Sequence, residues 1–263
     1  MASITKYRQK WLKYHNSYEK RAFKELRKVF KKWNNTVAGI EFVSEDTIKQ
    51  QLIANISSED MFNTYHMIYF NIGVAHGLRV GRFINTELTK EFTIDKFMEL
   101  FERNLPMFLR TFGITRIQQV HKTYLADVFQ LFDDRLKAGK TLKETTSEVF
   151  KVMKSPRFYR WQAERIARTE TTGAANYGAV QSGAVSGFVM QKRWISALDG
   201  RTRDPHARAN GQKVNEKEPF NVGGERMMYP GDPNASAGNV VNCRCTIAVV
   251  PKRDRNGRLI RIN

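Results

Sequence analysis

The stretch GAANYGAVQSGAVSG, residues 173–187, divides the chain into two parts with different sequence patterns. Eleven of the 17 glycines lie from Gly173 onward, and five of the seven prolines lie beyond residue 200. Because glycine and proline interrupt helices and favour turns, a helix-rich part gives way here to a turn-rich part. The sequence therefore predicts an α+β chain in which a helical N-terminal part is followed by a smaller turn-rich module with short β-strands.

Before this boundary, apolar residues recur with the period of a helix. At 100° per residue, one face of residues 18–33 is apolar and the opposite face carries seven Lys or Arg side chains. Further helices are predicted over residues 59–78, 94–112, with a bend at Pro106, and 114–136. Thr141 and Glu144 form a capping box for a helix that reaches about residue 154, and Ser155-Pro156 begin another that ends near residue 177.

After the boundary, the pattern favours strands and turns. Residues 188–195 and 245–250 are short and rich in β-branched or aromatic side chains, which predicts two strands. We expect three regions along the chain: residues 1–135 are helical and include the basic amphipathic helix, 136–251 form the turn-rich module, and 252–263 form a basic tail.

The net charge of +18 in 263 residues is concentrated at the two ends of the chain. Residues 1–33 contribute +9 and residues 252–263 contribute +4, which predicts a polyanionic partner. The chain is long enough for a core without disulfide bonds, lacks an apolar run of membrane-spanning length and opens without a secretory signal. Two cysteines suit a reducing compartment, so we expect a protein used inside a cell.

The cationic face of residues 18–33 is the candidate nucleic-acid interface. A helix face of this kind is usually solvated, but this one has no acidic residue among its cations to supply counter-charges. Phosphates would supply them, which predicts salt-dependent contact with double-stranded DNA of any sequence. The alternative is that the amphipathic helix lies on an anionic membrane or in an acidic groove of a protein. The predicted DNA-binding residues are Lys20, Lys24, Arg27, Lys28, Lys31 and Lys32.

Residues from about 140 to 250 contain an ordered series of polar and turn residues. The series is Arg168-Thr169-Glu170, Asn176, Trp194, Asp199-Gly200-Arg201-Thr202-Arg203, His206, Gly211, Pro230, Asp232-Pro233 and Asn242-Cys243-Arg244-Cys245. As a combination, it resembles the phage Mu F-like minor head protein family of tailed bacteriophages, also called the phage head morphogenesis domain. We expect Arg168, Glu170, Trp194, Asp199, Arg201 and Arg203 to be structural motif residues.

The resemblance implies a low-copy virion component that is assembled in the host cytoplasm. Such a protein associates with the portal protein and the procapsid, lies in the head interior or at the portal vertex, and affects DNA packaging or delivery. The expected role is not enzymatic. A nucleic-acid-binding protein unrelated to virions is a rival interpretation of the same charge distribution.

The charged residues of this series have both a structural and a catalytic interpretation. Arg168 or Glu170 is expected to pair with a charge from the segment 199–203, because buried charges need partners. The alternative is a nuclease or toxin-like enzyme, a metal-independent phosphodiesterase in which Glu170 and His206 transfer protons and Arg203 stabilises the phosphorane. The chain has no ATPase, α/β-hydrolase or zincin motif.

Cys243 and Cys245 are candidate metal ligands together with His206. Two positions apart on a predicted strand, the thiols point to the same face and are poorly placed for a mutual disulfide. Two thiolates and an imidazole are three of the four ligands of a tetrahedral zinc site. The alternative is a pair of small buried thiols without a metal. The fourth zinc ligand would be an aspartate: Asp199, Asp204 or Asp232.

Overall fold

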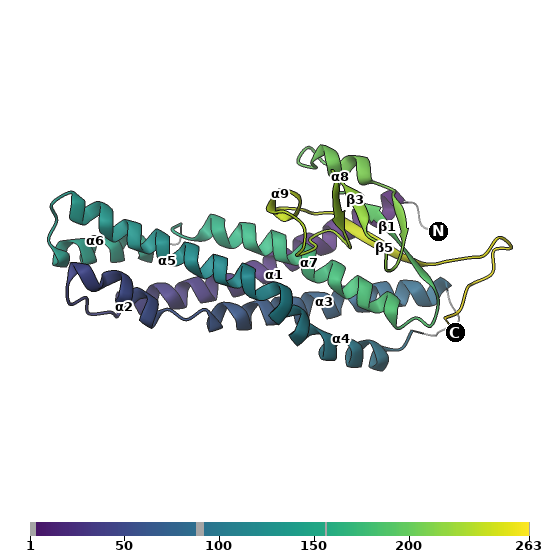
Figure 1. The fold of residues 1–263 in the computed structure, drawn as a ribbon, viewed down its shortest axis with the longest axis horizontal. Coiled ribbons are helices and arrows are strands. Elements are labelled where there is room, and N and C mark those ends of the chain that lie inside the picture. Colours follow the sequence, from purple (N-terminus) through teal and green to yellow (C-terminus); the bar gives the residue numbers. More distant parts are fainter. Residues whose placement is uncertain (1–3, 88–91, 156, 263) are drawn as a thin grey trace.

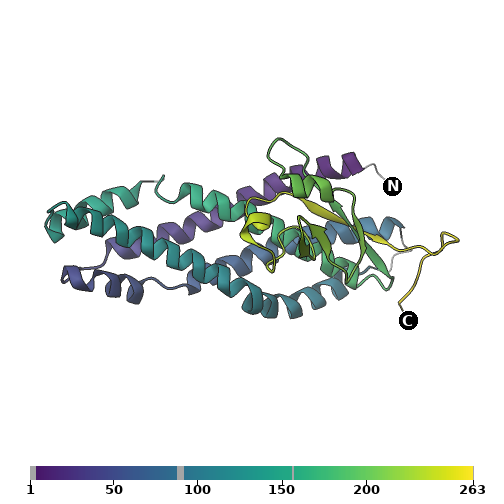
Figure 2. The same ribbon diagram turned by 45° about the horizontal axis from the view of Figure 1, so that its top comes forward.

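A computed structural model describes residues 4–87, 92–155 and 157–262. It confirms the predicted α+β class: long helices form an elongated shaft, and short strands gather beside one end of it (Figures 1 and 2). None of the described helices is both long and apolar enough to cross a bilayer. The shaft consists of α1 (Ile4–Ala38), η1 (Glu45–Thr47), α2 (Ile48–Asn55), α3 (Glu59–Glu87), α4 (Ile94–Phe108), η2 (Leu109–Gly113), α5 (Ile114–Lys137), α6 (Leu142–Lys154) and α7 (Arg160–Ala184).

Helix α7 is the central element of the shaft and packs along α3 and α1. Glycines allow α3 and α7 to approach closely, since a Cβ atom added to Gly178 would lie 2.0 Å from the Gly73 carbonyl oxygen. On α1, the predicted apolar face is buried, with Leu26 and Trp33 at 0% and 1% exposure. Burial of that face, rather than propensity alone, stabilises such a long helix.

The helix boundaries differ from the predicted ones in the middle of the shaft. Helix α1 extends well beyond residues 18–33 in both directions. The predicted gap between two helices after residue 112 is a π-helical turn, η2, which joins α4 to α5 directly. Pro106 lies within α4 just before this turn, and proline and π-helical turns are both common causes of helix bending. The sequence pattern missed η1 and α2 entirely.

The predicted capping box of α6 is confirmed, whereas the predicted start of α7 is wrong. The Thr141 hydroxyl accepts from the Glu144 N–H, and the Glu144 carboxylate accepts from the Thr141 N–H. Ser155 is the C-cap of α6 and not an N-cap, because its N–H donates to the Val152 carbonyl. Pro156 lies outside the described residues. Helix α7 begins at Arg160 and continues past residue 177, because its glycines pack closely against α3.

We call residues 188–262 the β-module. It contains β1 (Met190–Ile195), α8 (Asp204–Ala209), β2 (Lys213–Asn215), β3 (Phe220–Val222), β4 (Glu225–Met227), α9 (Ala237–Val240) and β5 (Thr246–Pro251). Strands β2, β1 and β5 form an antiparallel sheet in that order, and β3 pairs with β4. The predicted strands correspond to β1 and β5, each displaced by one or two residues, whereas β2, β3 and β4 were not predicted.

Asn176 fixes the β-module to the shaft. From α7, its amide group donates to the Pro230 and Cys245 carbonyls at 3.1 and 3.2 Å and accepts from the Ile247 N–H at 3.0 Å. Asn176 is fully buried, so these bonds replace water that the backbone groups have lost. The start of β5 is therefore positioned by one side chain of the central helix.

Candidate functional site

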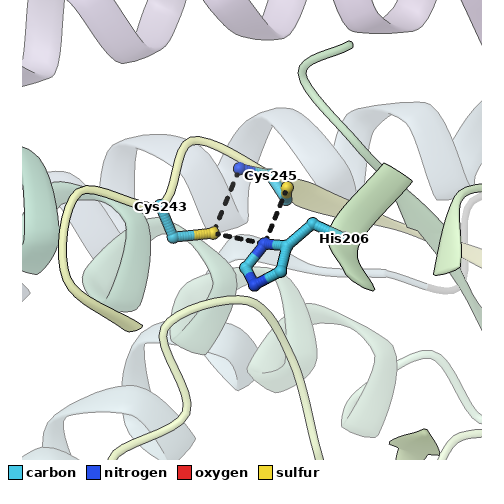
Figure 3. Close-up of side chains that lie close together, drawn as sticks. All are labelled: His206, Cys243 and Cys245. Atoms are coloured by element: carbon cyan, nitrogen blue, oxygen red, sulfur yellow. Dashed lines mark hydrogen bonds between the residues drawn. The ribbon is translucent and has the colours of Figure 1, made fainter. Parts of the chain in front are cut away.

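His206, Cys243 and Cys245 form a buried cluster in the β-module (Figure 3). Each residue is 2% exposed, and their ligand atoms all lie within 4.8 Å of one another. The Nδ1 atom of His206 lies 3.5 Å from both sulfur atoms. In a tetrahedral zinc site, bond lengths of about 2.3 Å to sulfur and 2.05 Å to nitrogen place these atoms about 3.6 Å apart. Both N–S distances are therefore close to those between the ligands of a zinc ion.

The elements around the cluster fix the histidine ring. His206 lies on α8, and its Nε2 lies 3.2 Å from Oδ1 of Asn239 on α9. The Asn239 amide nitrogen donates to the Val222 carbonyl, so its oxygen faces the imidazole and Nε2 carries the hydrogen. Nδ1 is then the unprotonated nitrogen and points at the sulfurs, and such an outer hydrogen bond is typical of metal-bound histidine. The Trp194 ring packs edge-on against the imidazole.

The cysteines are not on a strand, contrary to the prediction. They lie between α9 and β5, where the Cys243 N–H donates to the Val240 carbonyl and the Thr172 hydroxyl donates to the Cys243 carbonyl. These bonds to α9 and α7 replace strand pairing. Asn242 has a φ of 60°, a left-handed turn that precedes the pair. The thiols nonetheless converge, and both are free as expected.

Hydrogen bonds shift the pKa values of the two cysteine thiols in opposite directions. A hydrogen bond from Cys243 lowers the pKa of Cys245 well below its usual value. The same bond, together with burial, raises the pKa of Cys243. Backbone N–H groups reach both sulfurs: that of Cys245 donates to Cys243, and that of Ala197 donates to Cys245. Such donors stabilise thiolates, the form that binds a metal.

None of the three aspartates considered as a fourth ligand belongs to the cluster. Asp199 pairs with Arg244 at 2.7 Å, because its turn lies against the Cys-x-Cys segment. The Asp232 carboxylate accepts hydrogen bonds from the N–H groups of Met228 and Asn234, so both of its oxygens are bonded within the local turn. Asp204 is exposed at the start of α8. The described residues thus supply three ligands from His, Cys, Asp and Glu.

Arg168 and Glu170 are both paired, but not with the segment 199–203 as predicted. Arg168 pairs with Glu19 of α1 at 2.9 Å and donates to the Asn242 side chain. Glu170 accepts from the Tyr69 hydroxyl at 2.9 Å and pairs with Arg116 of α5. Two positions apart on α7, the side chains leave the helix in different directions and meet different helices. Glu170 therefore connects parts of the shaft, and Arg168 connects α7 both to α1 and to the β-module.

The remaining motif residues surround the cluster. Trp194 is fully buried in β1, and its indole N–H donates to the Ser196 hydroxyl. Arg203 precedes α8, and its guanidinium donates to the Val241 carbonyl. Arg201 is exposed and lines a groove of about 550 Å³ together with Arg168 and residues of α1.

The structure does not assemble the catalytic group considered as an alternative. Glu170 bonds to Tyr69 and Arg116 within the shaft, whereas His206 bonds to Asn239 and lies against the cysteines. Among the described residues, the two side chains share no hydrogen-bond partner. An acid/base pair of Glu170 and His206 therefore has no geometric support.

All seven cationic side chains of residues 18–33 are exposed on α1, while the opposite apolar face is buried in the shaft. The buried face is not available to insert into a membrane, which removes the argument for that alternative. The predicted lack of counter-charges is wrong at two positions: Lys28 pairs with Glu25 at 2.7 Å, and Lys32 pairs with Asp60 at 2.6 Å. Glu25 lies at the edge of the cationic face, and Asp60 comes from α3.

Sequence reasoning missed several residues that position the site. Asn239 orients His206, Thr172 binds the Cys243 backbone, and Arg116 neutralises Glu170. These residues lie on other elements, and their polar side chains are common on surfaces. Asn176 is one of the motif residues, but nothing in the pattern indicated its bonds to the backbone of β5.

Comparison with known proteins agrees with the ordered motif. A family described as "Phage Mu protein F like protein" matches residues 127–248. The uncharacterized protein YqbB of Bacillus subtilis (strain 168) is 26% identical over 253 residues, which cover 90% of this chain and 79% of YqbB. The NAD(+)--arginine ADP-ribosyltransferase EFV of Enterococcus faecalis (strain ATCC 700802 / V583) is 32% identical over 88 residues, which cover 32% of this chain and only 18% of that enzyme.

No solved structure matches the chain. The matched segment begins in α5, runs through the central helix α7 and includes the His206 and cysteine cluster. It thus contains every motif residue on which the predicted resemblance depends. Over residues 127–248, the chain is thus similar to the Phage Mu protein F like family.

Proposed function

We propose that this protein is a non-enzymatic minor head protein of a tailed phage. The observation that carries the proposal is the family match over residues 127–248. In this role the protein binds the portal protein at the portal vertex, enters the procapsid and acts in DNA packaging or delivery from within the virion. Co-purification of the full chain with a portal ring tests the proposed docking.

Nonspecific DNA contact is the second part of the proposal. Lys20, Lys24, Arg27 and Lys31 are exposed on α1, and none has an ion-pair partner among the described residues. Because the apolar side of α1 is buried, the cations have fixed spacing along a rigid helix. A row of unpaired cations on a rigid surface suits a phosphate backbone of any sequence. The basic segment 252–263 adds positive charge at the other end of the chain.

Removal of three of these charges tests the DNA contact. For each phosphate that the protein no longer neutralises, the slope of log affinity against log salt concentration should flatten by about 0.9. We expect the variant Lys24→Ala/Arg27→Ala/Lys31→Ala to flatten the slope for duplex DNA. The variant Lys143→Ala/Lys151→Ala/Lys154→Ala removes equal charge from α6 and should leave the slope unchanged. Equal slopes for both variants, or no duplex binding by the wild type, would contradict the contact.

Zinc bound by His206, Cys243 and Cys245 is the third part of the proposal. The N–S spacing, the histidine tautomer and the hydrogen bonds to both sulfurs fit this ion. The ion would connect α8 to the segment before β5 and so stabilise the β-module. Elemental analysis of the purified protein should find one zinc per chain, lost in Cys243→Ser/Cys245→Ser. Purified wild-type protein without stoichiometric zinc would contradict the proposed metal site.

The enzymatic alternatives gain no support from the site. The match to the ADP-ribosyltransferase covers 18% of that enzyme, so the activity in its name is not part of the proposal. The nuclease interpretation would need Glu170, Arg203 and His206 to act together, and their partners separate them. Cleavage of plasmid DNA or RNA by the wild type, abolished in His206→Ala, would overturn the non-enzymatic role.

A further inference from the structure

Two adjoining grooves lie where the first turns of α1 meet the end of α3 and the β-module. The first groove, of about 550 Å³, is formed by α1 and α3 and includes Lys10, Tyr14 and Arg82. The second, of about 260 Å³, is formed by α1, α3 and the sheet. Both are lined by Tyr7 and Phe83, whose rings meet edge to face with centroids 6.3 Å apart. The grooves therefore lie on either side of one aromatic pair.

The lining of both grooves is cationic. Lys10, Arg79 and Arg82 line the first groove, and Arg193 and Lys213 belong to the second. Among the described residues that line the two grooves there is no Asp or Glu, although the chain has 26 acidic residues. Lys10 and Arg82 are exposed, and neither forms an ion pair within the described residues. This distribution favours an anionic ligand that extends through both grooves.

Each groove also contains a buried polar atom without a hydrogen-bond partner among the described residues. His76 lines the first groove at 3% exposure, and neither of its ring nitrogens has a hydrogen-bond partner. In the second groove, the buried Nε of Arg193 has none. A buried polar atom that is left unpaired costs about 1–3 kcal/mol, and such atoms are rare in native structures. Each groove thus has one lining residue with buried polar atoms that are unsatisfied among the described residues.

Aromatic rings are the third feature of this surface. The Tyr7 hydroxyl donates to the Ile247 carbonyl at 3.1 Å, which fixes its ring between the grooves. The Arg79 guanidinium lies 4.4 Å from the centre of the Tyr14 ring, so a flat cationic surface adjoins the pair. Flat rings set among cations are the features by which proteins bind unpaired bases and their phosphates. In a duplex, the base faces are stacked inside and cannot reach such rings.

We infer that the two grooves form a binding site for single-stranded DNA. Bases would stack on the aromatic residues, and phosphates would contact Lys10, Arg82 and Lys213. The site is separate from the cationic residues 20–32 of α1 that are proposed to contact duplex DNA, so the two proposals can fail independently. It adds a preference for unpaired strands to the proposed function.

Fluorescence anisotropy with labelled oligo-dT of 20 nucleotides tests this inference. Lys10→Ala/Arg82→Ala/Lys213→Ala should weaken oligo-dT binding about tenfold or more, and Phe83→Leu should weaken it several-fold through reduced stacking. Thermal unfolding confirms that each variant is folded. The matched control is Lys143→Ala/Lys151→Ala/Lys154→Ala, which removes the same charge from α6 and should keep the oligo-dT affinity.

Three outcomes would overturn the inference. One is unchanged oligo-dT affinity in both folded groove variants, and another is equal weakening by the groove triple variant and the α6 control. The third is displacement of oligo-dT by polyglutamate at the same charge concentration as by unlabelled oligo-dT, because the site would then recognise acidic chains rather than bases. If Lys24→Ala/Arg27→Ala/Lys31→Ala loses duplex binding but keeps oligo-dT binding, the groove inference is supported. That result would concern only the proposed duplex interface on α1.

Discussion

Leu26, Phe30 and Phe101 are fully buried in the shaft among other apolar side chains, whereas the buried residues of the β-module include Lys192, Asp232 and His206. Every one of these three polar residues has hydrogen-bond partners within the module. Apolar packing depends on shape and volume, which several side chains can satisfy. A buried polar network depends on each partner, because one loss leaves an unpaired group in a low-dielectric interior. The two regions should therefore respond differently to similar changes.

Metal removal is expected to have the largest effect and to act on one region only. Stripping the proposed zinc with a chelator, or replacing both Cys243 and Cys245 by Ser, should destabilise the β-module by several kcal/mol, because the free energy of metal binding contributes to the free energy of folding. Hydrogen exchange measured by mass spectrometry should become faster at β1 and β5 and stay slow at α3. Added zinc should restore slow exchange to the stripped wild type but not to the variant. Unchanged exchange at β5 after stripping would show that the metal does not stabilise the module.

Substitution by an apolar residue of similar size next separates apolar packing inside the shaft from the polar contacts by which α7 holds the β-module. Leu26→Met keeps an apolar side chain of similar volume and should cost less than about 1.5 kcal/mol. Asn176→Leu is also close in size but leaves the Ile247 N–H and the Pro230 carbonyl unpaired, so we expect a loss of about 3 kcal/mol or more. The free energies of unfolding in urea provide the comparison. Similar costs for both variants would mean that the polar contacts between Asn176 and the β-module depend no more on their exact partner than apolar packing does.

Acid should act on the shaft through its two most buried histidines. Burial lowers the pKa of His15 and His76 from 6.5 to about 3 in the folded protein. The unfolded chain therefore binds more protons between these values, and stability falls as the pH drops from about 6.5 toward 3. At pH 5, each histidine should cost about 2 kcal/mol relative to pH 7.

The variant His76→Leu isolates one of these contributions. Its unfolding free energy should fall by about 2 kcal/mol less than that of the wild type between pH 7 and pH 5. His66→Leu removes a less buried histidine from the same helix and serves as the control for the loss of an imidazole. If the unfolding free energy of His76→Leu depends on pH as strongly as that of the wild type, the buried His76 ring is not a source of the acid sensitivity.

The smallest effect is expected at the surface of α1. Asp60→Asn breaks the exposed pair with Lys32 and should change stability by less than about 1 kcal/mol. Because the substitution frees a cation beside the proposed duplex interface, affinity for duplex DNA should rise modestly at low salt. Weaker binding by Asp60→Asn in an anisotropy titration would argue against that interface.

The same contrast explains what the sequence could predict. The period of apolar residues on α1 and the capping box at Thr141 are local signals, and both correspond to the observed helices. The ordered motif identified the family, and His206, Cys243 and Cys245 do converge. In contrast, the partners of Arg168 and Glu170 were predicted wrongly, because Glu19 and Arg116 come from distant helices that no local period indicates.

The main unpredicted features of the site are also nonlocal. Asn239 orients the imidazole from α9, and the cysteines lie before β5 rather than on it because they bond to α7 and α9. The strands β2, β3 and β4 span three residues each, too short for an alternating pattern to be recognised. Tertiary contacts determine which residues of a polar network bond to one another. The sequence therefore indicated several of the polar residues but not their hydrogen-bond partners.

The protein composition of purified phage particles tests the central claim, that this chain is a minor head protein, most directly. Quantitative mass spectrometry of procapsids and mature virions of the phage that encodes it should detect the chain at a few copies per particle, together with the portal protein. Complete absence of the chain from both kinds of particle, with the portal and major capsid proteins present, would contradict the account.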